Sequence, residues 1–325
     1  MFVAVLLFCL GLILLIKGGD WFVDGATGIA HRFHVPELLI GATVVSIGTT
    51  LPEVMVSASS TLTGHGEIAY GNAIGSIICN TALIAAIPII VKPGPVDAKA
   101  LRKPVFFFFG AAIFYCLVTY LTGYFSRWIG FALLAIFVVY MILTIREGFK
   151  KDKVPAHVQE EDAPSDENGS LGKFILLLVV GAILIAVGAD LLVDNGTIIA
   201  KELGVPESVI ALTFVALGTS LPELVTAITS LLKGHGALSL GNVIGANLFN
   251  LVLVSGVSVA LAPFQVPVSS TLMGYNASFV LDIPVMMSVM LFLTVPALVN
   301  KKLSRWQGIV LLAIYAAFCI IQFTM

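Results

Sequence analysis

Two glutamates lie inside long apolar segments, and each directly follows a proline. Glu53 ends the motif Gly-Thr-Thr-Leu-Pro-Glu, and Glu223 ends the motif Gly-Thr-Ser-Leu-Pro-Glu. A carboxylate in the middle of a membrane span costs about 3 kcal/mol or more, so it needs a compensating charge. No lysine or arginine lies at a similar depth in these segments, which leaves a bound cation or a proton. A permanently protonated, structural glutamate is the alternative, and the repetition at two matched positions argues against it.

The prolines and hydroxyl groups near each glutamate add further oxygen ligands. A proline inside a helix leaves the carbonyl four residues earlier without its donor, so we expect free carbonyls at Gly48 and Gly218. Such carbonyls are tolerated at membrane depth where they line a cavity or bind an ion. Hydroxyls recur at three- and four-residue spacing, which puts most of them on one helix face. They belong to Ser46, Thr49, Thr50, Ser57, Thr219 and Ser220. Helix packing is the alternative role for any one of them.

A stripe of amide side chains follows each acidic motif. The matched positions are Asn72, Ser76 and Asn80 in the first segment and Asn242, Ala246 and Asn250 in the second. Spacing by four places each set on one helix face. We expect Asn80 and Asn250 to act as ligands, whereas Asn72 and Asn242 could equally cap or pack. Glycines at 71, 75, 241 and 245 form Gly-x-x-x-Gly faces, which are typical of closely packed membrane helices.

The combined ligand set contains only oxygen, which indicates a hard cation. Ca²⁺ takes six to eight such oxygens. His65 and His235 lie in matched Gly-His-Gly turns and are predicted to be surface residues, so no imidazole or thiol indicates zinc or copper. Two ionised glutamates would balance one Ca²⁺, two Na⁺ or two protons. One site with mutually exclusive occupants is what an antiporter requires.

The composition indicates an all-α integral membrane protein. The chain has 325 residues, of which 58% are hydrophobic and 11% are charged, compared with about 25% charged residues in soluble domains. A membrane helix needs about 20 mostly apolar residues. Ten segments qualify: 2–24, 36–61, 68–90, 103–122, 126–146, 171–194, 207–231, 238–262, 278–297 and 304–324.

The two acidic motifs belong to a long internal repeat. Residues 35–84 align with 205–254 without gaps, at a constant offset of 170, and 22 of the 50 positions are identical. Each half therefore contains five spans. Because five is odd, the first half ends on the opposite side of the membrane from where it began, and the second copy runs through the membrane upside down. The sequence predicts two inverted five-helix repeats, 1–146 and 171–325, whose repeated motifs cover about 36–90 and 206–262. Inverted repeats are typical of secondary transporters, with the substrate site near mid-membrane.

The basic residues predict the orientation. Fourteen lysines and arginines fall in odd-numbered loops, and only Arg127 and Lys201 fall in even-numbered loops. Positive charge is concentrated on the cytoplasmic side of membrane proteins. We therefore expect a multi-pass protein of the cell membrane, with a cytoplasmic loop at 147–170 and both termini extracytoplasmic.

The repeated motifs resemble the α-repeats of the sodium/calcium exchanger family, within the calcium/cation antiporter superfamily, and the chain resembles its short bacterial members. The resemblance implies ten spans in two inverted halves, with spans 1 and 6 sliding across the core. It also implies that Glu53 and Glu223 bind Ca²⁺ together with the carbonyls of Thr49 and Thr219. The matching sodium positions are Thr50, Ser220, Ser76, Ser46 and the carbonyl of Ala216, with Asn80 and Asn250 flanking the acids.

Two residues depart from the family pattern. Ala246 stands where the first copy has Ser76, and Asn250 stands where some relatives carry aspartate. The first removes a sodium ligand, and the second leaves two formal charges at the site. The leading hypothesis is Ca²⁺/Na⁺ exchange. Both departures favour the alternative, a Ca²⁺/H⁺ antiporter.

Other classes of protein fit the sequence less well. A channel would also be compatible with inverted repeats, but it would conduct without countertransport. An intramembrane enzyme is disfavoured, because no Ser/His pair, His/Glu metal motif or aspartate pair lies at a common depth. We expect no cofactor and no nucleic-acid partner, only Ca²⁺, Na⁺ or H⁺ and membrane lipid. The two halves of a single chain are sufficient to form the site, so it does not require an oligomer.

Overall fold

The computed structural model describes residues 2–150, 170–203, 218–268 and 271–324. Within these residues, nine helical segments are long and apolar enough to cross a membrane. They are α1 (Phe2–Arg32), α2–η1–α3 (Glu37–Ile40, Gly41–Val45, Ser46–Leu62), α4–η2–α5 (Gly66–Cys79, Asn80–Ile84, Ala86–Val91), α6 (Ala98–Thr122), α7 (Arg127–Lys150), α8 (Leu171–Glu202), α11–η4–α12 (Gly236–Phe249, Asn250–Val254, Ser255–Leu261), η5–α13 (Ser278–Asp282, Ile283–Asn300) and α14 (Arg305–Thr324). A shorter apolar helix, α10, covers Leu221–Leu232.

These nine segments coincide with nine of the ten predicted spans. Helices α1 and α8 both run eight residues beyond their predicted ends, and α7 continues into the predicted loop as far as Lys150. The remaining span, predicted at 207–231, lies inside the described residues only from 218 onward, where α10 forms its last part. Most of the predicted loop at 147–170 lies outside the described residues.

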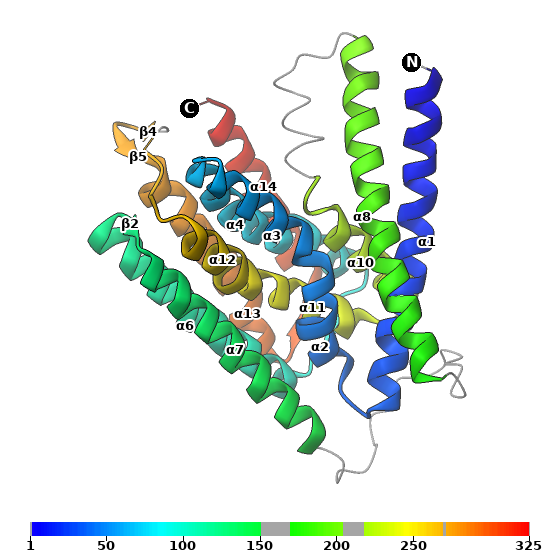
Figure 1. Ribbon diagram of the computed structural model, residues 1–325. Coiled ribbons are helices and arrows are strands. Elements are labelled where there is room, and N and C mark those ends of the chain that lie inside the picture. Colours follow the sequence, from blue (N-terminus) through cyan, green and yellow to red (C-terminus); the bar gives the residue numbers. More distant parts are fainter. Residues whose placement is uncertain (1, 151–169, 204–217, 269–270, 325) are drawn as a thin grey trace.

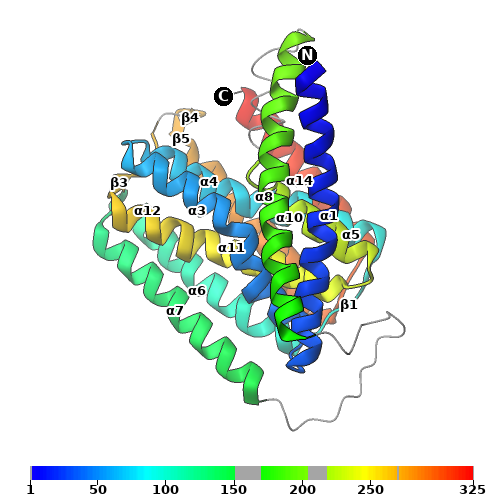
Figure 2. The ribbon, with the colours of Figure 1, turned by 45° about the vertical axis from the view of Figure 1, so that its right-hand side comes forward.

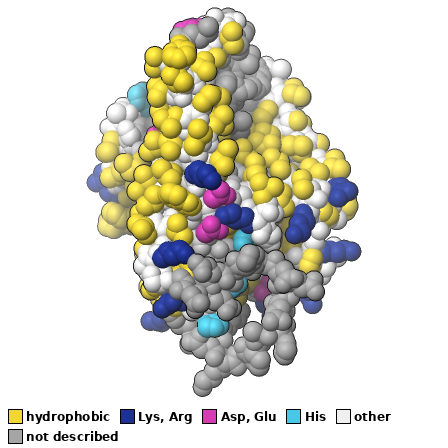
Figure 3. Space-filling model, turned by 90° about the vertical axis from the view of Figure 1, so that its right-hand side faces the viewer, with side chains coloured by type: hydrophobic (Ala, Val, Ile, Leu, Met, Phe, Trp, Pro, Cys, Tyr) yellow, Lys and Arg dark blue, Asp and Glu magenta, His cyan; other side chains and the backbone are white. Residues whose placement is uncertain are grey.

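Helices α1 and α8 form a long pair that stands beside the other helices (Figures 1 and 2). Glycines allow their backbones to touch. A Cβ atom on Gly18 would come within 2.9 Å of the Ile185 nitrogen, and one on Gly181 within 2.5 Å of the Phe22 nitrogen. The upper part of this face is covered by hydrophobic side chains, with charged side chains gathered lower down (Figure 3). The described residues therefore place a closely packed helix pair on the outside of the fold.

Helix α11 lies in the centre of the remaining helices and contacts α2, η1, α3, α6 and α10. Two of its glycines permit this position. A Cβ atom on Gly241 would lie 2.1 Å from the Leu38 carbonyl oxygen, and one on Gly245 would lie 2.3 Å from the Ser46 hydroxyl. The predicted packing role is confirmed for these two glycines. Their counterparts at 71 and 75 meet no described atom within 4 Å.

Short antiparallel strand pairs, which the sequence did not predict, join loops of the two halves. Strand β1 (Gly94–Pro95) pairs with β6 (Lys302–Leu303), and β2 (Tyr124–Phe125) pairs with β3 (Phe264–Gln265). A third pair, β4 (Thr271–Leu272) and β5 (Tyr275–Asn276), forms a local hairpin. The first two pairs link helix ends that are far apart in the sequence.

The chain ends mark the two sides of the molecule. The N- and C-termini both lie at the upper end in Figures 1 and 2, whereas α7 ends and α8 begins at the lower end. Each half of the chain therefore starts and finishes on opposite sides of the fold.

The contact at Gly241 generates a stability prediction. Replacing Gly241 with alanine should lower the free energy of unfolding by about 1–3 kcal/mol, because the new methyl group overlaps the backbone at Leu38. The measurement is the thermal unfolding midpoint of the detergent-purified protein. Gly110→Ala is the matched control, since Gly110 is an exposed helical glycine with no atom within 4 Å of its added Cβ. Equal midpoints for the two variants would contradict the packing described here.

Candidate functional site

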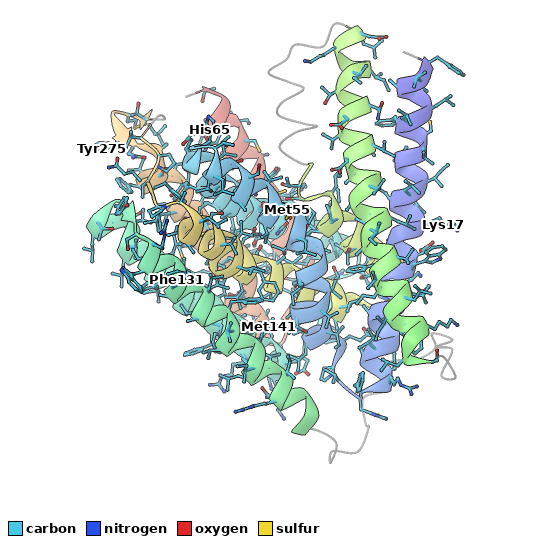
Figure 4. All side chains as sticks on the ribbon, viewed as in Figure 1. Lys17, Met55, His65, Phe131, Met141 and Tyr275 are labelled. Atoms are coloured by element: carbon cyan, nitrogen blue, oxygen red, sulfur yellow. The ribbon has the colours of Figure 1, made fainter. Side chains whose placement is uncertain are left out.

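Helix α3 buries its polar side chains and exposes its apolar ones. Its buried residues are Ser46, Thr49, Thr50, Glu53, Ser57 and Thr61. On the other side, Leu51 is 50% exposed and Met55, labelled in Figure 4, is 69% exposed. This pattern reverses that of a helix on the surface of a soluble protein. In a lipid environment, it gives α3 an apolar outside and an oxygen-rich face toward the protein interior.

The second acidic motif has a different local structure. Helix α10 begins at Leu221, so Pro222 lies in the first turn, where its missing N–H costs no helical hydrogen bond. The Gly218 carbonyl accepts a hydrogen bond from the Leu221 nitrogen at 3.2 Å. The prediction that Pro222 frees this carbonyl is therefore wrong. Pro52, in contrast, lies inside α3 as predicted.

The two glutamates both lie in the protein interior, and neither carboxylate is paired with another described residue. Glu53 and Glu223 are both fully buried. None of their four carboxylate oxygens has a hydrogen-bond partner within the described part of the chain. The helices that carry them, α3 and α10, contact each other. A buried charge without a partner is strongly unfavourable, so this arrangement calls for cations or protons.

A small cavity links the two motifs to the outer helix pair. Both motif prolines, Pro52 and Pro222, line it together with Thr49, Phe22 of α1 and Ile185 of α8. The cavity therefore lies between the acidic motifs and α1–α8. The repeated motifs, which are 170 residues apart in the sequence, come together in space at this point.

Two buried amides also have no hydrogen-bond partner among the described residues. Asn80 and Asn250 are fully buried, and each is the first residue of a π-helix, η2 or η4. Their amide oxygens and nitrogens have no partner among the described residues, and neither does the Thr50 hydroxyl. Buried polar groups are normally hydrogen-bonded, and short π-helical segments occur frequently at functional sites. Both observations favour a ligand-binding role for these residues.

Four of the other predicted hydroxyl residues, Ser46, Thr49, Ser76 and Thr219, already have protein partners. Thr49 and Ser46 each donate to the amide oxygen of Asn242 at 3.2 Å. Ser46 also lies 2.7 Å from the Gly41 carbonyl oxygen. Around Asn72, the hydroxyl of Thr219 lies 3.4 Å and that of Ser76 lies 3.5 Å from the amide oxygen. The spacing placed these two asparagines on the amide stripe but gave no sign that they would meet hydroxyls of the opposite half.

The described site residues come from four parts of the fold. They lie on α3, on α4–η2, on residues 218–223 at the start of α10, and on α11–η4, and these elements contact one another. Ser220 is buried at this junction, and so is Ala246, which offers no side-chain oxygen. Ala216, the last predicted sodium position, lies outside the described residues. The structure therefore brings together the predicted ligands that it describes.

The two turn histidines differ from each other. His65 is exposed in the turn between α3 and α4, as predicted (Figure 4). His235 is partly buried, with its Nδ1 2.8 Å from a carboxylate oxygen of Glu37. The expectation of a plain surface residue is wrong for His235, because the start of α2 lies directly against the start of α11.

The fold and the site define a class of protein: a polytopic helical membrane protein with a doubly acidic, oxygen-lined centre. The sequence profile of the sodium/calcium exchanger protein family matches residues 3–146 and 173–324. The chain is 34% identical to the inner membrane protein YrbG of Escherichia coli, over 82% of both chains. It is 29% identical to the sodium/calcium exchanger MaX1 of Methanosarcina acetivorans, over 98% of both chains.

A solved structure supports the same assignment. The sodium-calcium exchanger NCX_Mj superposes on this chain with a TM-score of 0.80, at 34% identity over 97% of both chains. The chain belongs to the sodium/calcium exchanger protein family, which consists of membrane antiporters and not of enzymes.

The unpartnered carboxylates generate a prediction about stability. In a Na⁺-free buffer containing a chelator, Glu53→Gln should raise the free energy of unfolding by about 1–3 kcal/mol, because a neutral amide replaces a buried charge. Added Ca²⁺ should raise the thermal midpoint of the unmodified protein. It should not raise that of the Glu53→Gln variant. Glu67→Gln, which alters an exposed acid at the start of α4, serves as the control. A lower midpoint for Glu53→Gln, with the Ca²⁺ response retained, would refute this interpretation.

Proposed function

We propose that this protein is a secondary active antiporter that exchanges Ca²⁺ for Na⁺, with Ca²⁺ held between Glu53 and Glu223. The observation that carries the proposal is the pair of fully buried carboxylates that have no partner among the described residues. One Ca²⁺ neutralises both charges and removes their mutual repulsion. Membership of the sodium/calcium exchanger protein family supports the same cargo.

The remaining Ca²⁺ ligands are neutral oxygens. The carbonyls of Thr49 and Thr219 belong to the segments that carry the two acids. The amide oxygens of Asn80 and Asn250 have no other partner in the described part of the chain. Together with the carboxylates, these groups supply enough oxygens for the six to eight that Ca²⁺ takes. Na⁺ competes for the same carboxylates and adds the hydroxyls of Thr50, Ser220, Ser76 and Ser46 and the carbonyl of Ala216.

Movement of the outer helix pair provides alternating access to this site. Phe22 of α1 packs against Gly48, where an added Cβ would lie 3.0 Å from the ring. The same ring lines the cavity beside both prolines. Sliding of α1 and α8 across the core changes which side of the membrane reaches that cavity.

The orientation is also part of the proposal. The fold consists of ten spans in two inverted five-helix halves, 1–146 and 171–325. The loop at 147–170 is cytoplasmic, and both termini are extracytoplasmic. The position of both chain ends on one side of the molecule supports this topology, as does the concentration of basic residues in the odd-numbered loops.

A Ca²⁺/H⁺ antiporter is the second candidate. It is favoured by Ala246 and Asn250, which together remove one hydroxyl and one charge relative to the family pattern. Two glutamates without protein partners can take up two protons in exchange for one Ca²⁺.

Flux measurements in proteoliposomes separate these candidates. A Na⁺ gradient should drive uptake of ⁴⁵Ca²⁺, and an imposed pH gradient without Na⁺ should not. Uptake that follows the pH gradient and ignores Na⁺ would replace the proposal with Ca²⁺/H⁺ exchange. Glu53→Gln and Glu223→Gln should each reduce the flux by about 100-fold, because each removes a buried charged ligand. The control Glu67→Gln should transport normally.

The asymmetry at Ala246 generates a prediction about sodium. Ala246→Ser should lower the half-maximal Na⁺ concentration by about fivefold, because it adds a hydroxyl ligand worth about 1 kcal/mol. Ser76→Ala is the reciprocal variant and should raise that concentration. The measurement is the Na⁺ dependence of ⁴⁵Ca²⁺ flux. An unchanged Na⁺ dependence in both variants would remove these positions from the sodium sites.

A further inference from the structure

Two asparagines that were not expected to be ligands connect the acidic motifs of the two halves. Asn242 of α11 lies in the second half, and its amide oxygen is 3.2 Å from the Thr49 hydroxyl of the first. Asn72 of α4 lies in the first half, and its amide oxygen is 3.4 Å from the Thr219 hydroxyl of the second. The pairs are related by the same offset of 170 that relates the two motifs. The bonds therefore form a reciprocal pair across the junction of the halves.

The orientation of the Asn72 amide follows from its neighbours. Its nitrogen donates to the Glu53 carbonyl oxygen at 3.3 Å and to the Ser57 hydroxyl at 2.9 Å. A backbone carbonyl can only accept, so the NH₂ group must face it. The amide oxygen is thereby left to accept from Thr219 and Ser76. At Asn242, the Thr49 hydroxyl likewise donates to the amide oxygen, at 3.2 Å.

We propose that Asn72 and Asn242 are positioning residues of the ion site, and that each accepts a hydrogen bond from the hydroxyl of a site threonine in the opposite half. A hydroxyl carries one proton and two lone pairs. The proton has to point away from a cation, so it needs an acceptor on the far side of the hydroxyl. The hydrogen bond to the amide oxygen holds the threonine side chain in one orientation. In that orientation, the hydroxyl lone pairs and the adjacent backbone carbonyl remain free for the ion. This inference rests on the cation site proposed above.

The two asparagines are not equivalent. Asn72 holds the backbone of Glu53 and the Ser57 hydroxyl as well as the hydroxyls of Ser76 and Thr219. The nitrogen of Asn242 has no partner among the described residues. The reason lies in the sequence, since Ala227 occupies the position that matches Ser57. Substitution of Asn72 should therefore have the larger effect.

A pair of double-mutant cycles tests the proposal, with equilibrium binding of ⁴⁵Ca²⁺ to the purified protein as the readout. The first cycle combines Asn72→Leu with Thr219→Val, and the second combines Asn242→Leu with Thr49→Val. Each single change should weaken Ca²⁺ binding by about tenfold, and each double variant should lie within about twofold of its single variants. Thr219→Ser and Thr49→Ser retain the donor and should bind Ca²⁺ with nearly normal affinity.

Several results would overturn the proposal. Multiplicative losses in the double variants would show that the asparagine and the threonine act independently, for example if the amide binds the ion directly. Unchanged binding in the single variants, or equal losses in the valine and serine variants, would have the same consequence. The second cycle keeps the test open if Asn72→Leu fails to fold, because Asn242 makes fewer bonds. If the unmodified protein binds Ca²⁺ but does not exchange it, the proposed function fails and the positioning role stands. Absence of Ca²⁺ binding would end both.

Discussion

The burial of two like charges without a protein counter-charge is the constraint on which the rest of this structure depends. Glu53 and Glu223 are fully buried, and no basic side chain among the described residues pairs with them. A low dielectric strengthens both their repulsion and their attraction for a cation. The buried acids need compensating groups nearby. The buried polar face of α3 and the buried amides at Asn80 and Asn250 fit this need. In the proposed site, their neutral oxygens would add ligands without adding charge.

The helices around the site hold it through contacts between the two halves of the chain. Gly241 and Gly245 allow α11 to approach the 38–46 segment at backbone distance, which brings Asn242 within reach of Thr49. Strand pairs at the loops join the same halves at their edges. The α1–α8 pair remains outside this framework and meets it beside the motif prolines. A core that joins both halves, with a separate outer pair, is compatible with the alternating access proposed above.

Much of this arrangement is visible in the sequence, because composition, spacing and repetition are local properties. Apolar length predicted nine of the described segments, and depth within the predicted spans singled out both glutamates. Three- and four-residue spacing gave the polar face of α3. The hydrogen bonds between Asn72 and Thr219 were not predictable, since they join residues 147 positions apart. The π-helices at Asn80 and Asn250 depend on backbone register, which has no simple residue signature. The start of α10 at Leu221 also differs from the kink expected at Pro222, although the two motifs are nearly identical.

The central claim is that a single divalent cation binds between the two glutamates. Anomalous X-ray diffraction from crystals soaked in Sr²⁺, a heavier substitute for Ca²⁺, locates such an ion directly. The account predicts one strong peak within coordination distance of both Glu53 and Glu223, which weakens as Na⁺ is added to the soak. A peak that contacts neither carboxylate, or no peak at the junction of α3 and α10 at saturating Sr²⁺, would contradict it.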